Sequence, residues 1–137
     1  MIVADTGAVV ALLDADDLHH KVLRDLFATR PDAWILPWAI LPEVDYLVSS
    51  RFGARVQEAF LEDLGSETFL VEWGEPQDVT EALRIHRHHK ALRLGLVDSV
   101  VIAVAARLRA EAIATLDLRH FGAVRLPGNL KLYPRDL

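Results

Sequence analysis

The chain has 137 residues, of which 52% are hydrophobic, and its formal net charge is −5 with histidine neutral. This length fits one domain over residues 1–137, no apolar run is long enough for a membrane span, and the lack of a basic segment before Asp5 argues against a signal peptide. Cysteine is absent, which excludes disulfides, cysteine-bound zinc and thiol catalysis and is compatible with a location in the reducing cytoplasm.

Apolar runs and turn signals in the first half of the chain predict two strands and four helices. In chain order these are a strand over 2–5, helices over 8–13 and 16–29, a strand over 34–36, and helices over 38–50 and 54–64. The second helix is expected to begin at a cap formed by Asp16 or Asp17, with Leu18, Val22 and Leu26 on one face. Proline at position 42 is tolerated because the N–H groups of a helix's first turn have no partner within the helix.

The second half of the chain predicts further alternation of strands and helices. In chain order these are a strand over 68–71, helices over 76–92 and 97–108, a strand over 112–116, a loop that begins at 120–121, and a fifth strand over 130–133. Such alternation is typical of a parallel sheet covered by helices on both faces. The sequence therefore predicts a three-layer α/β/α sandwich around a mainly parallel sheet of four to five strands.

Four carboxylates interrupt or close apolar stretches, namely Asp5, Glu43, Asp98 and Asp117. An ionised carboxylate rarely lies within apolar sequence unless something compensates its burial. Asp5 and Asp117 follow predicted strands, and Glu43 and Asp98 lie near the starts of predicted helices. All four can therefore meet beyond the carboxyl ends of the strands, where open α/β sheets bind ligands. Because hard divalent cations take oxygen ligands and offset mutual repulsion, the pattern indicates a Mg²⁺ or Mn²⁺ site.

Residues 82–97 contain no acid and form the one strongly basic segment. One interpretation is that Arg84, Arg87 and Lys90 contact the phosphates of a nucleic acid, and the alternative is a solvated helix face. His120 has a similar pair of interpretations, because it either approaches a phosphate or packs within its loop.

Four segments carry a resemblance to a known family. They are DTGAVVALLD (5–14), PEVDYL (42–47), LGLVDSVVIA (94–103) and ATLDLRHF (114–121). In this order and at these spacings the chain resembles the PIN-domain ribonucleases, and specifically the VapC-type toxins of bacterial toxin–antitoxin pairs. The resemblance covers residues 1–133, which is nearly the whole chain.

The resemblance implies a PIN-like fold and an endoribonuclease toxin that hydrolyses RNA phosphodiester bonds with Mg²⁺ or Mn²⁺. It assigns the catalytic and metal-holding roles to Asp5, Glu43, Asp98 and Asp117. It also implies products with 5′-phosphate and 3′-hydroxyl ends, a small VapB-like antitoxin that blocks the acidic site, and a homodimer.

Two positions depart from the family pattern. Many members carry serine where this chain has Gly7, so either Thr6 or Thr115 supplies the missing hydroxyl, or that hydrogen bond is absent. Thr6 is also a candidate RNA contact beside the acids. Pro42 stands where a helix former is more usual, and we expect it to shift the start of the helix while leaving Glu43 in place.

The alternative function is a catalytically inactive PIN-like module that is retained for protein interaction. Retention of all four acids counts against it. An aspartyl phosphotransferase or phosphatase would need a second aspartate where Gly7 stands, and a dinucleotide-binding fold would need Gly-x-Gly-x-x-Gly after the first strand, which is absent.

Overall fold

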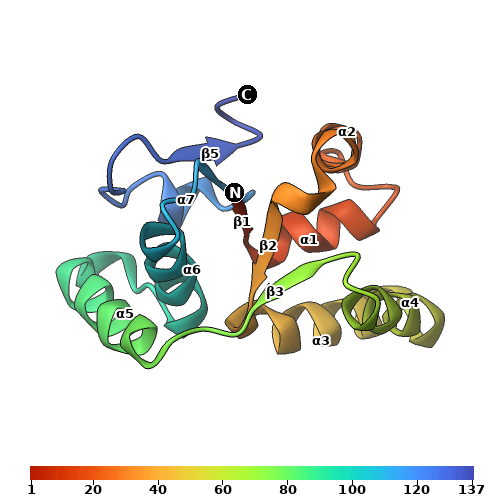
Figure 1. Ribbon diagram of the computed structural model, residues 1–137, viewed down its shortest axis with the longest axis horizontal. Coiled ribbons are helices and arrows are strands. Elements are labelled where there is room, and N and C mark those ends of the chain that lie inside the picture. The colour runs from red at the N-terminus through yellow and green to blue at the C-terminus, as the bar shows by residue number, and fades with distance from the viewer.

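A computed structural model describes residues 1–137 and places five parallel strands in one sheet (Figure 1). The strands are β1 (Ile2–Ala4), β2 (Trp34–Pro37), β3 (Leu70–Glu72), β4 (Ala112–Ala114) and β5 (Lys131–Tyr133). Their order across the sheet is β3-β2-β1-β4-β5, so β1 is central, and Ala4 of β1 lies opposite Ala114 of β4. The carboxyl ends of β1 and β4 therefore lie beside each other.

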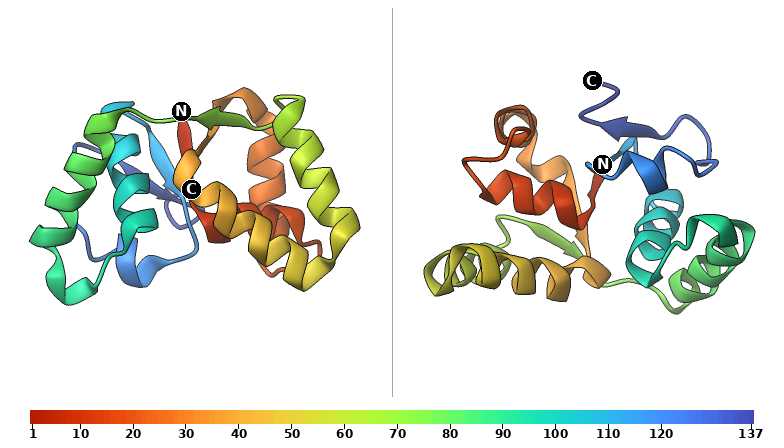
Figure 2. Two further views of the ribbon diagram at one scale, coloured as in Figure 1. Left: turned by 90° about the horizontal axis from the view of Figure 1, so that it is seen from below. Right: turned by 180° about the vertical axis from the view of Figure 1, so that it is seen from behind.

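Seven α-helices cover this sheet. They are α1 (Thr6–Leu13), α2 (His20–Thr29), α3 (Leu41–Phe52), α4 (Ala54–Gly65), α5 (Pro76–His88), α6 (Leu96–Arg107) and α7 (Leu118–Phe121). Helices α5 and α6 lie on one side of the sheet and α1 to α4 on the other (Figures 1 and 2), which confirms the predicted α/β/α sandwich. None of these helices has the length and apolar character that crossing a bilayer would require.

The core forms where the central strands meet α6. The side chains of β1 and β4 are all fully buried, as expected for parallel strands that are covered on both faces. Every residue from Ser99 to Ala105 in α6 is also buried. A helix that is apolar on all sides belongs inside a protein, and α6 contacts β1, β4 and β2. This packing fixes the position of the first turn of α6, which carries Asp98.

The start and the buried face of α2 differ from the prediction. The helix begins at His20 because the acids before it satisfy local backbone groups: Asp17 accepts a hydrogen bond from the His19 N–H at 2.7 Å. The buried side chain of α2 is Leu23, whereas Leu18 is 91% exposed. Leu26 packs against the core as predicted, but Leu18 and Val22 are exposed, so the prediction was wrong for these two residues.

Several element boundaries also move. Helix α1 begins at Thr6 with Asp5 as its N-cap residue, two residues earlier than predicted. Strand β3 begins at Leu70 because the N–H groups of Thr68 and Phe69 both point to the Asp63 carbonyl at the end of α4. Helix α5 ends at His88, with a separate 3₁₀ turn over Lys90–Leu92. The segment 118–121, expected to lead into a loop, forms α7.

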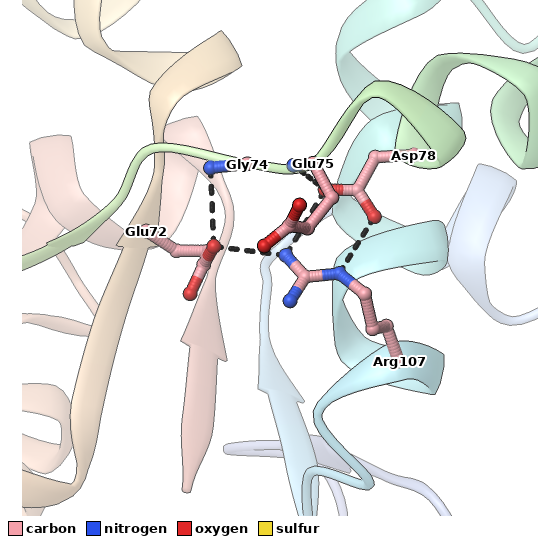
Figure 3. A network of polar contacts seen from close by, with 5 residues as sticks. All are labelled: Glu72, Gly74, Glu75, Asp78 and Arg107. Atoms are coloured by element: carbon pink, nitrogen blue, oxygen red, sulfur yellow. Dashed lines mark hydrogen bonds and ion pairs between the residues drawn. The ribbon is translucent and has the colours of Figure 1, made fainter.

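A partly buried ionic network joins the end of α6 to β3 and the start of α5 (Figure 3). Arg107 Nε donates to Asp78 Oδ1 at 2.7 Å, and its Nη2 donates to Asp78 Oδ2 at 3.0 Å and to Glu72 Oε1 at 2.9 Å. The Gly74 N–H donates to the same Glu72 oxygen at 3.0 Å, and the Glu75 N–H donates to Asp78 Oδ2 at 2.9 Å. Burial acts to raise the pKa of Asp78, but the hydrogen bonds from Arg107 and Glu75 outweigh it and hold that pKa below 3.8.

We expect Arg107→Leu to lower the free energy of unfolding by about 3 kcal/mol, because it leaves the Asp78 carboxylate buried without its cation. This is the lower end of the range for broken buried pairs, since Arg107 is itself 25% exposed. Urea unfolding at pH 7 measures the effect. Arg24→Leu, which breaks an exposed pair with Asp25, is the matched control and should change little. Equal losses in the two variants would contradict a stabilising role for the network.

Candidate metal centre

The structure brings the four predicted acids to one cleft. Asp5 follows β1, Glu43 lies in the first turn of α3, Asp98 lies in the first turn of α6, and Asp117 is the N-cap residue of α7 after β4. All four line an open cleft of ≈ 380 Å³ at the carboxyl edge of the sheet. The convergence that the topology predicted is therefore present, and the catalytic and metal-holding roles of these residues stay predictions.

The hydroxyl of Thr115, which directly follows β4, fixes the positions of Asp5 and Asp117. Thr115 Oγ1 donates to Asp5 Oδ2 at 2.9 Å and accepts a hydrogen bond from the Asp117 N–H at 3.0 Å. Thr115, and not Thr6, thus supplies the hydroxyl contact to Asp5 in a chain that has glycine at position 7. A Cβ atom at Gly7 would meet nothing within 4 Å, so this departure leaves open space in the cleft.

Burial and mutual repulsion raise the pKa values of two of the acids. Asp5 is only 5% exposed, and its pKa rises from 3.8 to about 6, chiefly because of burial and further because of Asp98 and Asp117. Hydrogen bonds from Thr115 and from the Thr6 backbone offset part of this rise. The pKa of Asp98 is also raised, first by burial and then by Asp117 and Glu43, against the lowering effect of His120. The positive charge near Asp5 and Asp98 is therefore too small to offset burial and the neighbouring carboxylates.

His120 lies against two of the acids, contrary to the interpretation as a packed loop residue. Its Nδ1 is 3.1 Å from Asp98 Oδ2 and 2.9 Å from Asp117 Oδ2, and its backbone N–H donates to Asp117 Oδ1 at 3.1 Å. This buried nitrogen lies within ion-pair distance of both oxygens but has no hydrogen-bond partner by geometry. One atom from each of Asp98, Asp117 and His120 lies within 4.8 Å of the others, a spacing at which they could share an ion.

The donor set fits a hard divalent cation. Carboxylate oxygens from four separate elements face one space, and hard divalent cations prefer oxygen. Thr6, which lines the same cleft, is buried, and its Oγ1 has no hydrogen-bond partner. A buried hydroxyl without a partner is rare in a folded protein, and an ion or its bound water would satisfy it. Thr6 is therefore at the site, and its predicted contact with RNA stays a prediction.

Two charged residues of the cleft were missed in the sequence. Asp17, which was considered only as a helix cap, lines the cleft, as does Arg51 of α3. Helical periodicity could have found Arg51, because Glu43, Leu47 and Arg51 recur every four residues on one face of α3. Asp17 had no such signal, since it lies in the turn between α1 and α2.

The basic segment lies outside this cleft. Arg84, Arg87 and Lys90 are exposed and do not line it. Arg84 forms an ion pair with Glu81 one turn earlier on α5, and the neighbouring carboxylate weakens the attraction of Arg84 for an anionic ligand. Contact between this segment and RNA remains a prediction about the surface beyond the cleft.

Comparisons with known proteins agree on one family. The model of the PIN domain family matches residues 2–125. Ribonuclease VapC26 of Mycobacterium tuberculosis is 30% identical over 124 residues, which cover 90% of this chain and 92% of that protein.

Solved structures show the same fold. Mycobacterium tuberculosis VapC20, described as a sarcin-ricin loop cleaving toxin, superposes with a TM-score of 0.79 at 23% identity, over 90% of this chain and 95% of that one. DNA-bound VapBC from Salmonella typhimurium gives a TM-score of 0.73 at 17% identity, over 96% of this chain and 95% of that one.

We expect Asp5→Asn to stabilise the metal-free protein at pH 7. At pH 7 the Asp5 carboxylate is ionised in both the folded and the unfolded protein, but it is buried only in the folded protein. A rise in its pKa from 3.8 to about 6 lowers the free energy of unfolding by at most about 3 kcal/mol, which the substitution would restore. Below pH 3.8 the Asp5 carboxyl is protonated in both the folded and the unfolded protein. The stability that Asp5→Asn gains over wild type should therefore be absent there and should develop between pH 3.8 and 6. Urea unfolding in EDTA at several pH values measures it, with exposed Asp16→Asn as control. A less stable Asp5→Asn protein at pH 7 would contradict this interpretation.

Proposed function

We infer that this chain, which belongs to the PIN-domain family and is a relative of the VapC ribonucleases, is an endoribonuclease toxin whose activity requires Mg²⁺ or Mn²⁺. The observation that carries this inference is the meeting of Asp5, Glu43, Asp98 and Asp117 in one cleft, with too little positive charge around them. Residues 1–137 act as one PIN-like domain in this proposal. The reaction is hydrolysis of an RNA phosphodiester bond.

The four acids have two roles in this proposal: two hold the metal ion and two act on water. Asp5, fixed by the Thr115 hydroxyl, and Asp98, fixed by the packing of α6, would hold the ion. When bound, the ion neutralises charge that develops on the phosphate and makes a water more acidic. Glu43 is exposed on the first turn of α3, so its carboxylate can orient the attacking water and accept its proton. Asp117 would act through a bound water.

The same cleft suits an inhibitory protein partner. Asp5, Asp17, Glu43, Asp98 and Asp117 line it against the single cation of Arg51. A guanidinium from a VapB-like antitoxin would find paired carboxylate acceptors there and would take the place of the metal charge. Metal, RNA and antitoxin would then compete for one site, and the toxin would act as a homodimer when it is free.

Mg²⁺ or Mn²⁺ should stabilise the folded protein, because the ion binds the assembled cluster and not the unfolded chain. At a concentration of 100 times Kd the gain is roughly 2.7 kcal/mol, or about 10 °C in Tm for a chain of this size. Asp98→Asn should blunt the rise measured by calorimetry, whereas exposed Asp16→Asn should leave it intact. A full response in Asp98→Asn would exclude Asp98 as a ligand.

Purified protein without antitoxin should cut total bacterial RNA at discrete positions in the presence of Mg²⁺ or Mn²⁺. The cuts should vanish with EDTA and in Asp98→Asn, and mapping of the 5′ ends should find 5′-phosphates. Intact RNA after incubation with folded, metal-bound protein would favour an interaction module over an enzyme.

A further inference from the structure

Arg51 is the one basic residue that lines the acidic cleft, which it shares with five carboxylates. We propose that Arg51 is a substrate-positioning residue, whose guanidinium binds an RNA backbone phosphate that flanks the cleaved one. This role rests on the ribonuclease function proposed above. It adds a guanidinium contact within the cleft to the RNA contacts that the sequence had suggested for Thr6, for His120 and for the separate basic segment with Arg84, Arg87 and Lys90.

The geometry of α3 places Arg51 at a distance from the centre of the reaction. Glu43, Leu47 and Arg51 follow one another at intervals of four residues along the helix, and all three line the cleft. Eight residues at 1.5 Å each separate the backbone positions of Glu43 and Arg51 by about 12 Å along the helix axis. Arg51 lines the same cleft as the acids, and long side chains on a helix tend to lean toward its N-terminus, which is the end that carries Glu43. That spacing suits a neighbouring phosphate and not the one under attack.

The guanidinium of Arg51 is not engaged by the protein. Arg51 is exposed and its side chain makes no hydrogen bond or ion pair, although five carboxylates line the same cleft. The other arginine close to several acids, Arg107, is bound on two sides by Asp78 and Glu72. Because Arg51 is held by no partner, all its N–H donors remain available to a ligand.

Phosphate chemistry matches this free cation. A phosphodiester carries two nonbridging oxygens, and a planar guanidinium can donate to both at once. An RNA strand that crosses the cleft must pass a surface dominated by carboxylates, and a bound divalent ion compensates charge only near itself. A cation farther along the cleft reduces the repulsion for the next phosphate. Its contribution is to substrate binding, and the acids retain the chemical step.

The test is steady-state cleavage of a short fluorescein-labelled RNA that spans the cut site mapped in total RNA. We expect Arg51→Ala to raise KM roughly tenfold, as expected for loss of a charged hydrogen bond, with kcat within about threefold of wild type. The slope of log(1/KM) against log salt should become shallower by about 0.7. Arg51→Lys should restore the slope and part of the affinity, because it keeps the charge but not the planar fork.

Arg55→Ala is the matched control, because Arg55 is exposed on the neighbouring helix α4, forms no ion pair and does not line the cleft. Mn²⁺ affinity by calorimetry and the circular dichroism spectrum should be equal in Arg51→Ala and wild type, which separates positioning from misfolding or loss of metal. A KM unchanged from wild type, or a loss confined to kcat, would overturn the assignment. Absence of cleavage by wild type would instead overturn the ribonuclease function.

Discussion

Carboxylates gather at the carboxyl edge of a buried parallel sheet, where Asp5 and Asp98 are held close to other acids and lose hydration through burial. Asp5 is under this constraint most strongly, because it closes the central strand and is almost completely covered. The Thr115 hydroxyl and the packing of α6 hold the oxygen atoms in place without neutralising them. The energy stored in this arrangement is what a divalent cation, or a guanidinium from a partner, would relieve on binding.

The two ends of helix α6 contrast a buried acid that a cation compensates with a half-buried acid that has less compensation. At its end, Arg107 donates three hydrogen bonds to Asp78 and Glu72, and the pKa of Asp78 falls despite burial. Near its start, Asp98 has a raised pKa, and the nearest basic group is the imidazole of His120. About 14 Å of buried helix separates Asp98 from Arg107 by helical rise. The same helix therefore stabilises the fold at one end and carries an acid with a raised pKa at the other.

An acidic protein that acts on a polyanion has to reverse its charge locally. In the proposed function, an ion bound among the four acids would change the sign of the field near the phosphate that is cut, and Arg51 would extend positive charge along α3. His120 Nδ1 lies within ion-pair distance of both Asp98 and Asp117. Net charge alone argues against RNA binding by this chain, but the positions of these few groups permit it.

The sequence by itself determined the alternation of strands and helices and the four acids, because apolar periodicity and isolated carboxylates are local signals. It also determined that Asp5 and Asp117 follow strands, from which a common edge follows once the strands are parallel. The tertiary structure decided which hydroxyl reaches Asp5, since Thr115 arrives from a strand more than 100 residues away. It also decided the contact of His120 with Asp98, the place of Asp17 in the cleft and the buried face of α2. Each of these depends on the packing of segments distant in sequence, and local periodicity does not record that packing.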